Sequence, residues 1–375
     1  MGALPVSAPS ATLTRLCALL RCDATNQSDW SGWDDADWTE IVALANRNFL
    51  APALHAALEA APGRAAVPFD AAWYLAMLHR LNAARNAKLR SQIEELALAL
   101  NGVDIRPMLL KGAATLFAGP FADPASRMIG DVDILIDPAC RDRGLAALSR
   151  IGYTALRLYP ETHNAYGDLG KSGQPGAIDL HVEPIDCPHL LSASELRQRA
   201  SAIAIGSAQA LVPCPTDRVF HNILHAEIHD VGGFYLGRLP LRDLHELATA
   251  SAAFGGAIDW SFMRQRAREH SMTSVLQSYV LAAHRLFGGP WPFAGRQTLC
   301  AEIHFRRRLA QFRHPWLEAL AVPWGNLRGA FARHRMRALY GASGGGFVLA
   351  WRFMHGIRFL SRHSLGLAAS RLFRI

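Results

Sequence analysis

The sequence lacks the cysteine patterns and the long apolar runs that define several protein classes. Its six cysteines are scattered and form no CxxC pair, which argues against a structural zinc site and against a disulfide scaffold. Residues 1–14 contain no basic segment followed by an apolar one, and no stretch reaches the ~18 to 20 uncharged apolar residues of a membrane-spanning helix. We therefore expect a cytoplasmic protein with reduced thiols and no transmembrane segment.

Lysine is scarce as well, and the basic charge is unevenly distributed. There are only three lysines, and 39 basic against 31 acidic residues give a net charge of +8. Residues 301–375 hold thirteen arginines and two acids, a net charge of +11, so the remainder carries −3. The arginine clusters at 306–308 and 333–337 are expected either to face an anionic partner (RNA, a lipid surface or an acidic carrier) or to form a solvated basic surface. The segment 347–360 interleaves aromatic and basic residues, as interfacial helices do, so it is expected either to lie at an interface or to pack on the preceding helices.

What is present is enough apolar material for two or three compact units. Half of the 375 residues are hydrophobic and 19% are charged, which excludes disordered and collagen-like chains. Apolar residues recur at helical spacing over 34–100 and again after 216. We expect a helical N-terminal region at 1–104, a helical region at 213–298 that packs on the core, and a basic, Arg-rich helical region at 299–375.

Between the helical regions, the sequence predicts an α/β core at 105–212. Apolar runs too short for helices, bounded by Gly, Pro or Asp, predict strands at 108–110, 132–136, 153–159 and 178–180. Asp137-Pro138 predicts a helix start, because Asp is a good N-cap and Pro suits the first helical position. These elements together indicate a small mixed sheet.

The strongest candidate for chemistry is the pair Asp131 and Asp133 in the sequence GDVDILI. Alternate residues of a strand share a face, so the two carboxylates would project together while Val132 and Ile134 are buried on the other side. Like charges this close repel unless a cation lies between them, and a hard divalent cation such as Mg²⁺ is suited to that position. An exposed edge strand with two solvated acids explains the same pattern.

Two weaker motifs flank this pair along the chain. Upstream, an apolar strand ends at Lys111 and Gly112, where glycine would let a phosphate approach a helix N-terminus and lysine would add positive charge. Downstream, Asp179 offers a third carboxylate on another strand, and His181 shares its face. Taken singly, each motif also fits an ordinary strand and turn.

Together the motifs resemble the polymerase-β nucleotidyltransferase superfamily, and in particular its bacterial members of undefined acceptor. The resemblance rests on LKG at 110–112, Arg127, DVDIL at 131–135 and IDLH at 178–181. It implies an α+β fold in which a small mixed sheet of the polymerase-β type is flanked by N-terminal and C-terminal helical regions. The turn Gly112-Ala113 departs from the Gly-Ser or Gly-Gly common in the superfamily, so it has no hydroxyl to help hold phosphates.

The resemblance also implies roles for individual residues. Asp131, Asp133 and Asp179 would be the catalytic carboxylates and would hold Mg²⁺, with Mn²⁺ as an alternative. The expected nucleotide-binding residues are Lys111, Gly112, Arg127, His181 and His225.

Two of these assignments leave alternatives open. Arg127 lies four residues before the Asp pair, so it either contacts phosphate oxygens or forms a salt bridge that aligns Asp131 or Asp133. His221, His225 and His229 recur every four residues on one helix face. They would line a nucleotide cleft through His225 or His229, or serve as structural residues.

The leading hypothesis is a Mg²⁺-dependent nucleotidyltransferase that moves a nucleoside monophosphate from an NTP, such as ATP, to an acceptor hydroxyl. The acceptor would be a small molecule, a peptide or protein, or RNA. The alternative is a catalytically silent, antitoxin-like binding module that keeps the fold and holds a partner through its basic C-terminal region. The three carboxylates favour the enzyme, whereas the missing serine in the turn favours the silent module.

Overall fold

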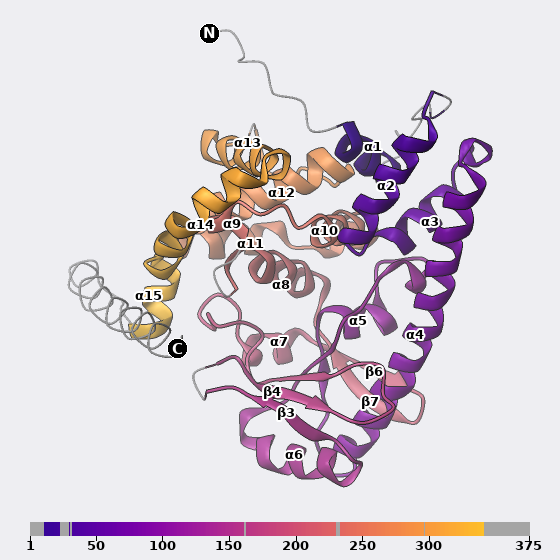
Figure 1. Cartoon of the computed structure of the whole chain (residues 1–375). Helices are drawn as coiled ribbons and strands as arrows, with labels where there is room; N and C mark the ends of the chain where they lie inside the picture. The colour runs from indigo at the N-terminus through magenta and orange to yellow at the C-terminus, as the bar shows by residue number, and fades with distance from the viewer. Residues whose placement is uncertain are drawn as a thin grey trace, which may run out of the picture.

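A computed structural model describes residues 11–22, 30, 32–160, 163–229, 233–295 and 297–340, without the side chains of 337–340. The aromatic and basic segment 347–360 lies outside the described residues. Helices surround a seven-stranded mixed sheet, which confirms the predicted α+β class (Figure 1). None of the helices in the described part of the chain could span a membrane, and the six cysteines form no disulfide bond.

The sheet has the strand order β3-β4-β5-β2-β1-β7-β6. Its central strand β2 runs parallel to β5 on one side and antiparallel to β1 on the other. β1 is also parallel to β7, and the outer pairs β3-β4, β4-β5 and β6-β7 are antiparallel. The strands are β1 Met108–Leu109, β2 Val132–Leu135, β3 Thr154–Leu158, β4 Ala165–Gly170, β5 Ile178–His181, β6 Ser201–Ile205 and β7 Ala208–Val212.

The four predicted strands correspond to β1, β2, β3 and β5, whereas β4 and the β6-β7 hairpin were not predicted. A signal for it is present, because Gly206-Ser207 is a two-residue loop of the kind that joins hairpin strands. Gly206 has a φ of +56°, which glycine adopts without steric cost.

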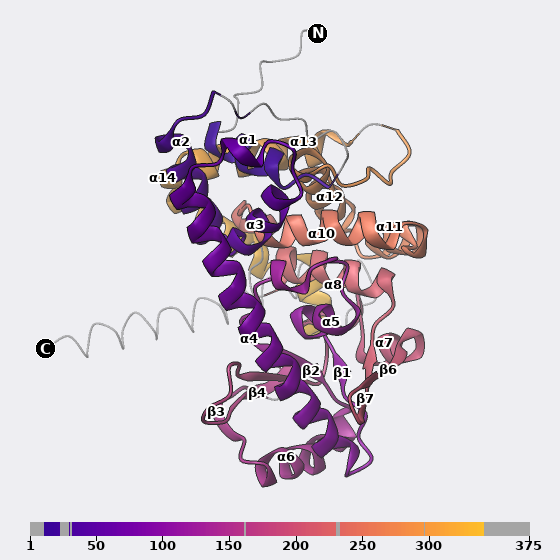
Figure 2. The ribbon, with the colours of Figure 1, turned by 90° about the vertical axis from the view of Figure 1, so that its right-hand side faces the viewer.

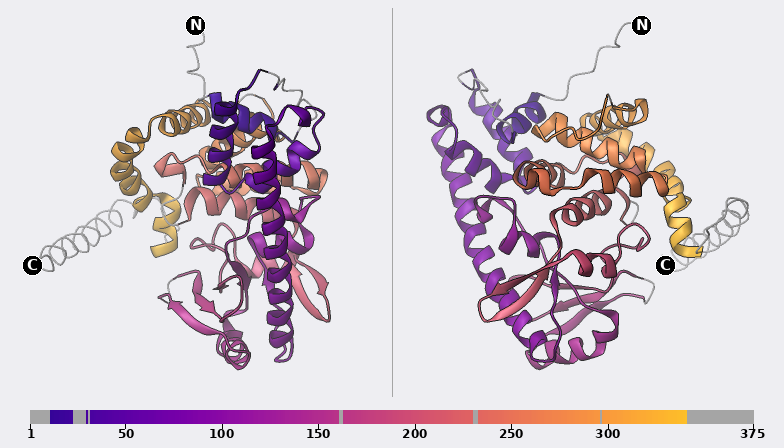
Figure 3. Two further views of the ribbon diagram at one scale, coloured as in Figure 1. Left: turned by 45° about the vertical axis from the view of Figure 1, so that its right-hand side comes forward. Right: turned by 180° about the vertical axis from the view of Figure 1, so that it is seen from behind.

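The N-terminal helices are α1 Ala11–Leu19, α2 Asp35–Arg47, α3 Ala51–Glu59 and the 33-residue α4 Phe69–Asn101. In α4, Leu89, Ile93, Leu96 and Leu100 are buried at alternating spacings of four and three residues, which gives the helix one continuous apolar face. Its C-terminal half contacts β7 and α6, Arg141–Arg150. Figures 2 and 3 show α4 running from the N-terminal helices down the whole side of the sheet.

The remaining helices lie above the sheet in the view of Figure 1, apart from α5 and α7, which lie close to it. They are α5 Lys111–Ala118, α7 Ala193–Arg199, α8 Pro215–Ile228, α9 Gly233–Leu236, α10 Leu241–Phe254, α11 Trp260–Glu269, α12 Thr273–Phe287, α13 Leu299–Arg313, α14 Pro315–Ala330 and α15 Arg333–Tyr340. Short 3₁₀ turns occur at η1 Arg64–Ala66, η2 Pro124–Ser126, η3 Pro138–Cys140 and η4 Gly255–Ala257.

Two apolar cores meet at the central strand. Val132 and Ile134 belong to the core shared with α4 and α6, whereas Leu135 belongs to the core shared with α8, α10 and α12. Because side chains alternate along a strand, Asp133 shares the face of Leu135. The sheet therefore presents this carboxylate toward the helices that follow the core in the chain.

Candidate active site

Asp133 and Asp179 lie side by side on neighbouring parallel strands. They are direct register partners in the β2-β5 ladder, and Asp133 is only 2% exposed while Asp179 is half-buried. Because β2 has a strand on each side, the alternative of an exposed edge strand with two solvated acids is wrong. The sheet holds two carboxylates together in a buried setting.

His181 connects these two carboxylates. Its Nε2 lies 3.0 Å from Asp133 Oδ1 and 3.0 Å from Asp179 Oδ2, and its Nδ1 lies 3.2 Å from the Asn164 amide nitrogen. Burial alone would lower the pKa of His181, but the hydrogen bonds to the two aspartates raise it above its ordinary value. The side chain is 2% exposed, so the structure places it beneath the acids rather than at a nucleotide-accessible surface.

Lys111 neutralises Asp133 from the other side. Its Nζ lies 2.6 Å from Asp133 Oδ1. Burial opposes both charges, yet Lys111 and His181 hold the pKa of Asp133 well below its usual range, and Asp133 raises the pKa of Lys111. Lys111 has a φ of +42°, an uncommon conformation for a residue with a side chain. This backbone strain lies at the point where the strand gives way to α5.

Asp131 stands apart from this buried group. It precedes β2 and is exposed. Partial burial and repulsion from Asp133 raise the pKa of its carboxyl, while Lys111 opposes the rise. Asp131 thus lies within electrostatic reach of the buried acids, at the solvent side of the site.

The residues that converge can hold a metal ion. One ligand atom from each of Asp133, Asp179 and His181 lies within 4.8 Å of the others. Asp179 Oδ1 is buried without a hydrogen-bond partner in the described part of the chain, and a cation would satisfy it. The predicted set was Asp131, Asp133 and Asp179, so the structure brings two of these together and adds His181.

Gly112 lies in the first turn of α5 and is packed tightly. A Cβ placed on it would come within 2.9 Å of Ile129 Cγ2, so this glycine is required by side-chain packing rather than by an open path to the backbone. The α5 N-terminus has no side-chain cap, which leaves N–H groups of the first turn available to a phosphate.

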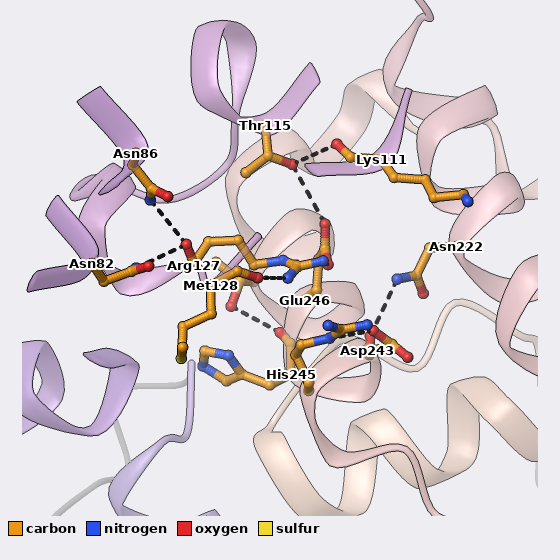
Figure 4. Close-up of polar contacts among 12 residues, drawn as sticks. Asn82, Asn86, Lys111, Thr115, Arg127, Met128, Asn222, Asp243, His245 and Glu246 are labelled. Atoms are coloured by element: carbon orange, nitrogen blue, oxygen red, sulfur yellow. Dashed lines mark hydrogen bonds and ion pairs between the residues drawn. The ribbon is translucent and has the colours of Figure 1, made fainter. Parts of the chain in front are cut away.

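Arg127 forms its salt bridge with a residue that the sequence analysis did not identify. Its Nη2 lies 2.7 Å from Glu246 Oε2 on α10, and Thr115 Oγ1 lies 3.1 Å from the Lys111 carbonyl and 3.4 Å from Glu246 Oε1 (Figure 4). The proposed salt bridge to Asp131 or Asp133 is therefore not formed. Arg127 instead joins the segment before β2 to α10.

A cavity lies next to Lys111, between α5, α8 and α10. Four basic side chains line it: Lys111, Arg127, Arg218 and Arg242. Arg242 pairs with Asp243 at 2.9 Å, whereas Arg218 has no carboxylate partner among the described residues. Arg218 instead donates to the Ala118 carbonyl and lies 5.0 Å from the centre of the Phe254 ring, and burial lowers its pKa to about 10. Asp243 and Glu246 also line the cavity, where they pair with Arg242 and Arg127, so Arg218 is the lining cation best placed to attract an anion.

The three histidines of α8 have separate environments. His221 Nε2 lies 3.0 Å from the Pro184 carbonyl oxygen, and His229 Nδ1 lies 3.1 Å from Asp186. His225 stacks on His229 and lines the cavity. Burial, reinforced by the charge of Lys111, holds the pKa of His225 well below its usual value, so it is neutral at pH 7. Arg218 lies two helical turns before His225, and this spacing could have identified it from the sequence.

The first C-terminal arginine cluster is not a solvated basic surface. Arg308 is fully buried against Glu227 of α8, Arg307 donates to the Tyr235 carbonyl at 2.9 Å, and Arg306 pairs with Glu302 at 2.7 Å. The expectation of a solvated basic face fails here because each side chain has its own protein partner. The side chain of Arg337 lies outside the described residues.

The fold and this site fit the nucleotidyltransferase class, with paired acids on adjacent parallel strands beside an uncapped helix N-terminus. A family model described as an uncharacterised nucleotidyltransferase matches residues 34–288. The chain belongs to that family, which confirms the resemblance seen in the motifs. No curated protein and no solved structure gives a significant match.

Proposed function

We propose that the protein transfers a nucleoside monophosphate from an NTP to an acceptor hydroxyl, with a divalent metal as cofactor. The observation that carries this proposal is the pair Asp133 and Asp179 on adjacent strands, in which Asp179 Oδ1 is buried and has no hydrogen-bond partner among the described residues. A purely structural acid pair would have its oxygens satisfied by protein donors. Through Lys111 this pair also adjoins a cavity lined by four basic and two acidic side chains.

The carboxylates of Asp133 and Asp179 would hold the cation, and Asp131 would complete its coordination from the solvent side. His181 would join them as a ligand only after losing the proton that its Nε2 shares with the two acids. Bound there, Mg²⁺ or Mn²⁺ would neutralise the charge of the phosphates. Asp179 is the more exposed of the two paired acids, with 21% of its side chain exposed against 3% for Asp133. We assign Asp179 the role of accepting the proton of the acceptor hydroxyl.

The basic cavity would hold the nucleotide. Arg218 has no acid to neutralise it among the described residues, so it is the arginine best placed to pair with a phosphate, together with Lys111 and the first turn of α5. His225 is neutral and would contact the base or sugar through a hydrogen bond. Arg127 would support this wall through Glu246. ATP is the expected donor, and a cytoplasmic location would supply it.

The test uses purified protein, each α-labelled NTP in turn, Mg²⁺, and a lysate of the host cell as the source of acceptor. Asp133→Asn should weaken NTP binding and abolish transfer, because it removes charge from the buried centre. Asp179→Asn should keep most of the NTP affinity and lose transfer by about 10²-fold or more, the size expected for a lost general base.

Asp168→Asn is the matched control. Asp168 is the register partner of Asp179 on the other side, in β4, and it accepts a hydrogen bond from the Tyr159 hydroxyl at 3.0 Å. This variant should label the acceptor at the wild-type rate. If Asp179→Asn transfers as well as wild type, the assignment is wrong. If wild type binds NTP and labels nothing, the silent binding module is the better description.

A further inference from the structure

Helix α14 exposes a continuous apolar stripe to solvent. Trp316, Leu320, Trp324 and Leu327 are 61%, 66%, 69% and 40% exposed. Their spacing of four, four and three residues places them within an arc of roughly 80° on one side of the helix. A single exposed leucine is ordinary, but two tryptophans and two leucines in line form a patch that needs an explanation.

The opposite side of α14 explains how the helix is anchored while this stripe stays uncovered. Gly325 and Gly329 are buried, and they lie roughly 180° from the stripe. A Cβ on Gly325 would come within 2.7 Å of the Tyr235 carbonyl oxygen, so the helix packs closely on α9 through its glycines. Helix α14 therefore turns its small residues toward the rest of the protein and its large apolar residues toward solvent.

The charges around the stripe are basic. Arg313, Arg328 and Arg333 are exposed near the two ends of the helix. The one acid of α14, Glu318, is on the glycine side and pairs with Arg238 at 3.3 Å. The stripe therefore carries no negative charge of its own, and it belongs to a region, 301–375, with a net charge of +11.

We propose that α14 docks the protein on the surface of an anionic lipid bilayer. The helix would lie in the plane of the interface, with the tryptophan and leucine side chains among the acyl chains and the arginines at the phosphate level. Tryptophan suits this position because its ring is apolar while its N–H prefers the polar headgroup layer. The α14 helix lies beyond the family match, which ends at residue 288, so this surface is an addition to the transferase unit.

The same observations disfavour two other occupants. RNA would use aromatic rings and arginines, but Leu320 and Leu327 offer no stacking surface, and they make up half of the stripe. A second copy of the chain would bring one arginine-rich region against another, and like charges would repel. An anionic bilayer complements both the apolar stripe and its basic surroundings.

The experiment is co-sedimentation of the full-length protein with vesicles. Wild type should pellet with vesicles of mixed phosphatidylcholine and phosphatidylglycerol, and should remain in the supernatant with phosphatidylcholine alone. The double variant Trp316→Ser/Trp324→Ser should lose binding by about tenfold or more, and Arg328→Glu should lose it by a smaller factor that grows as salt is lowered.

The matched control is Trp73→Ser, which removes a tryptophan that is 53% exposed on α4, far from the stripe in the sequence, and it should bind as wild type does. Thermal unfolding should show that all variants are folded. Three results would overturn the proposal: wild type that ignores the anionic vesicles, a double variant that pellets like wild type, or a loss in the double variant of RNA binding or dimer formation instead of vesicle binding. None of these depends on whether the protein transfers nucleotides.

Discussion

At the scale of single residues, Gly112 shows how a motif position can be required for packing. Its missing side chain leaves the space that Ile129 fills, so the glycine secures the contact between α5 and the segment before β2. Lys111, the preceding residue, is held with a positive φ and its ammonium on Asp133. Small shifts at Gly112 would therefore move Lys111 relative to the acids.

We predict that Gly112→Ala destabilises the protein by about 1 to 3 kcal/mol, the usual cost of overpacking. Helix propensity alone predicts the opposite sign, because alanine normally stabilises a helix relative to glycine by about 1 kcal/mol. Urea unfolding measures the difference. In an Ile129→Ala background the cost of Gly112→Ala should shrink. Gly130→Ala, where an added Cβ meets nothing within 4 Å, is the control and should leave stability nearly unchanged.

At the scale of elements, a buried ion pair joins α8 to α13. Glu227 and Arg308 are both fully buried, and the Arg308 guanidinium also lies 5.9 Å from the centre of the Tyr279 ring of α12. Burial raises the pKa of Glu227, and Arg308 opposes the rise. Burying the pair costs desolvation free energy, but the two opposite charges stabilise each other. Removing one charged side chain alone is therefore expected to lower the stability of the protein strongly.

Arg308→Met should therefore lower the free energy of unfolding by about 3 to 5 kcal/mol, because it leaves Glu227 buried and unpaired. Adding Glu227→Leu should recover most of that loss, which a simple loss of packing would not allow. Calorimetric melting of the single and double variants checks both statements. Arg306→Met, which breaks a part-exposed pair with Glu302, is expected to cost less than about 1 kcal/mol; equal costs at the two sites would contradict the argument.

At the scale of the whole molecule, buried histidines make the fold sensitive to acid. The pKa values of His245, His304 and His334 are lowered to about 4, and that of His221 to about 3, mainly by burial. These side chains lie on α8, α10, α13 and α15, so neutral histidines are distributed across the helical region. Folding requires each of them to stay unprotonated.

Stability should fall as the pH decreases from about 6.5 toward 4, because the unfolded chain then binds protons that the folded histidines do not accept. Each histidine contributes about 1 kcal/mol per pH unit within this window. His181 acts in the opposite sense, since its pKa is raised, but it is one group against these four together with His55 and His225, whose pKa values are lowered as well. Urea unfolding at pH 7 and pH 5 measures the change, and His334→Gln should flatten the slope. A midpoint that does not move between these pH values would contradict the prediction.

The sequence by itself determined the strand that carries Asp133, the strand that carries Asp179 and the turn at Lys111, and hence the family. These features follow from local patterns: a period of two in buried strands and a glycine where a strand meets a helix. Local periodicity also predicted correctly that Asp133 faces away from Val132 and Ile134. Such patterns involve only a few neighbouring residues, so they can be recognised in the sequence without knowledge of the fold.

Only the tertiary structure decided which side chains meet. The register of β2 against β5 places Asp133 opposite Asp179 and brings His181, rather than Asp131, into the buried group. Arg127 pairs with Glu246, which is 119 residues away in the sequence. Arg308, which belongs to a basic cluster in the sequence, is buried in an ion pair with Glu227 of α8. These pairings depend on how helices that are distant in the sequence pack against one another. A local sequence pattern cannot predict them, because a charged residue is equally compatible with solvent until packing removes the water around it.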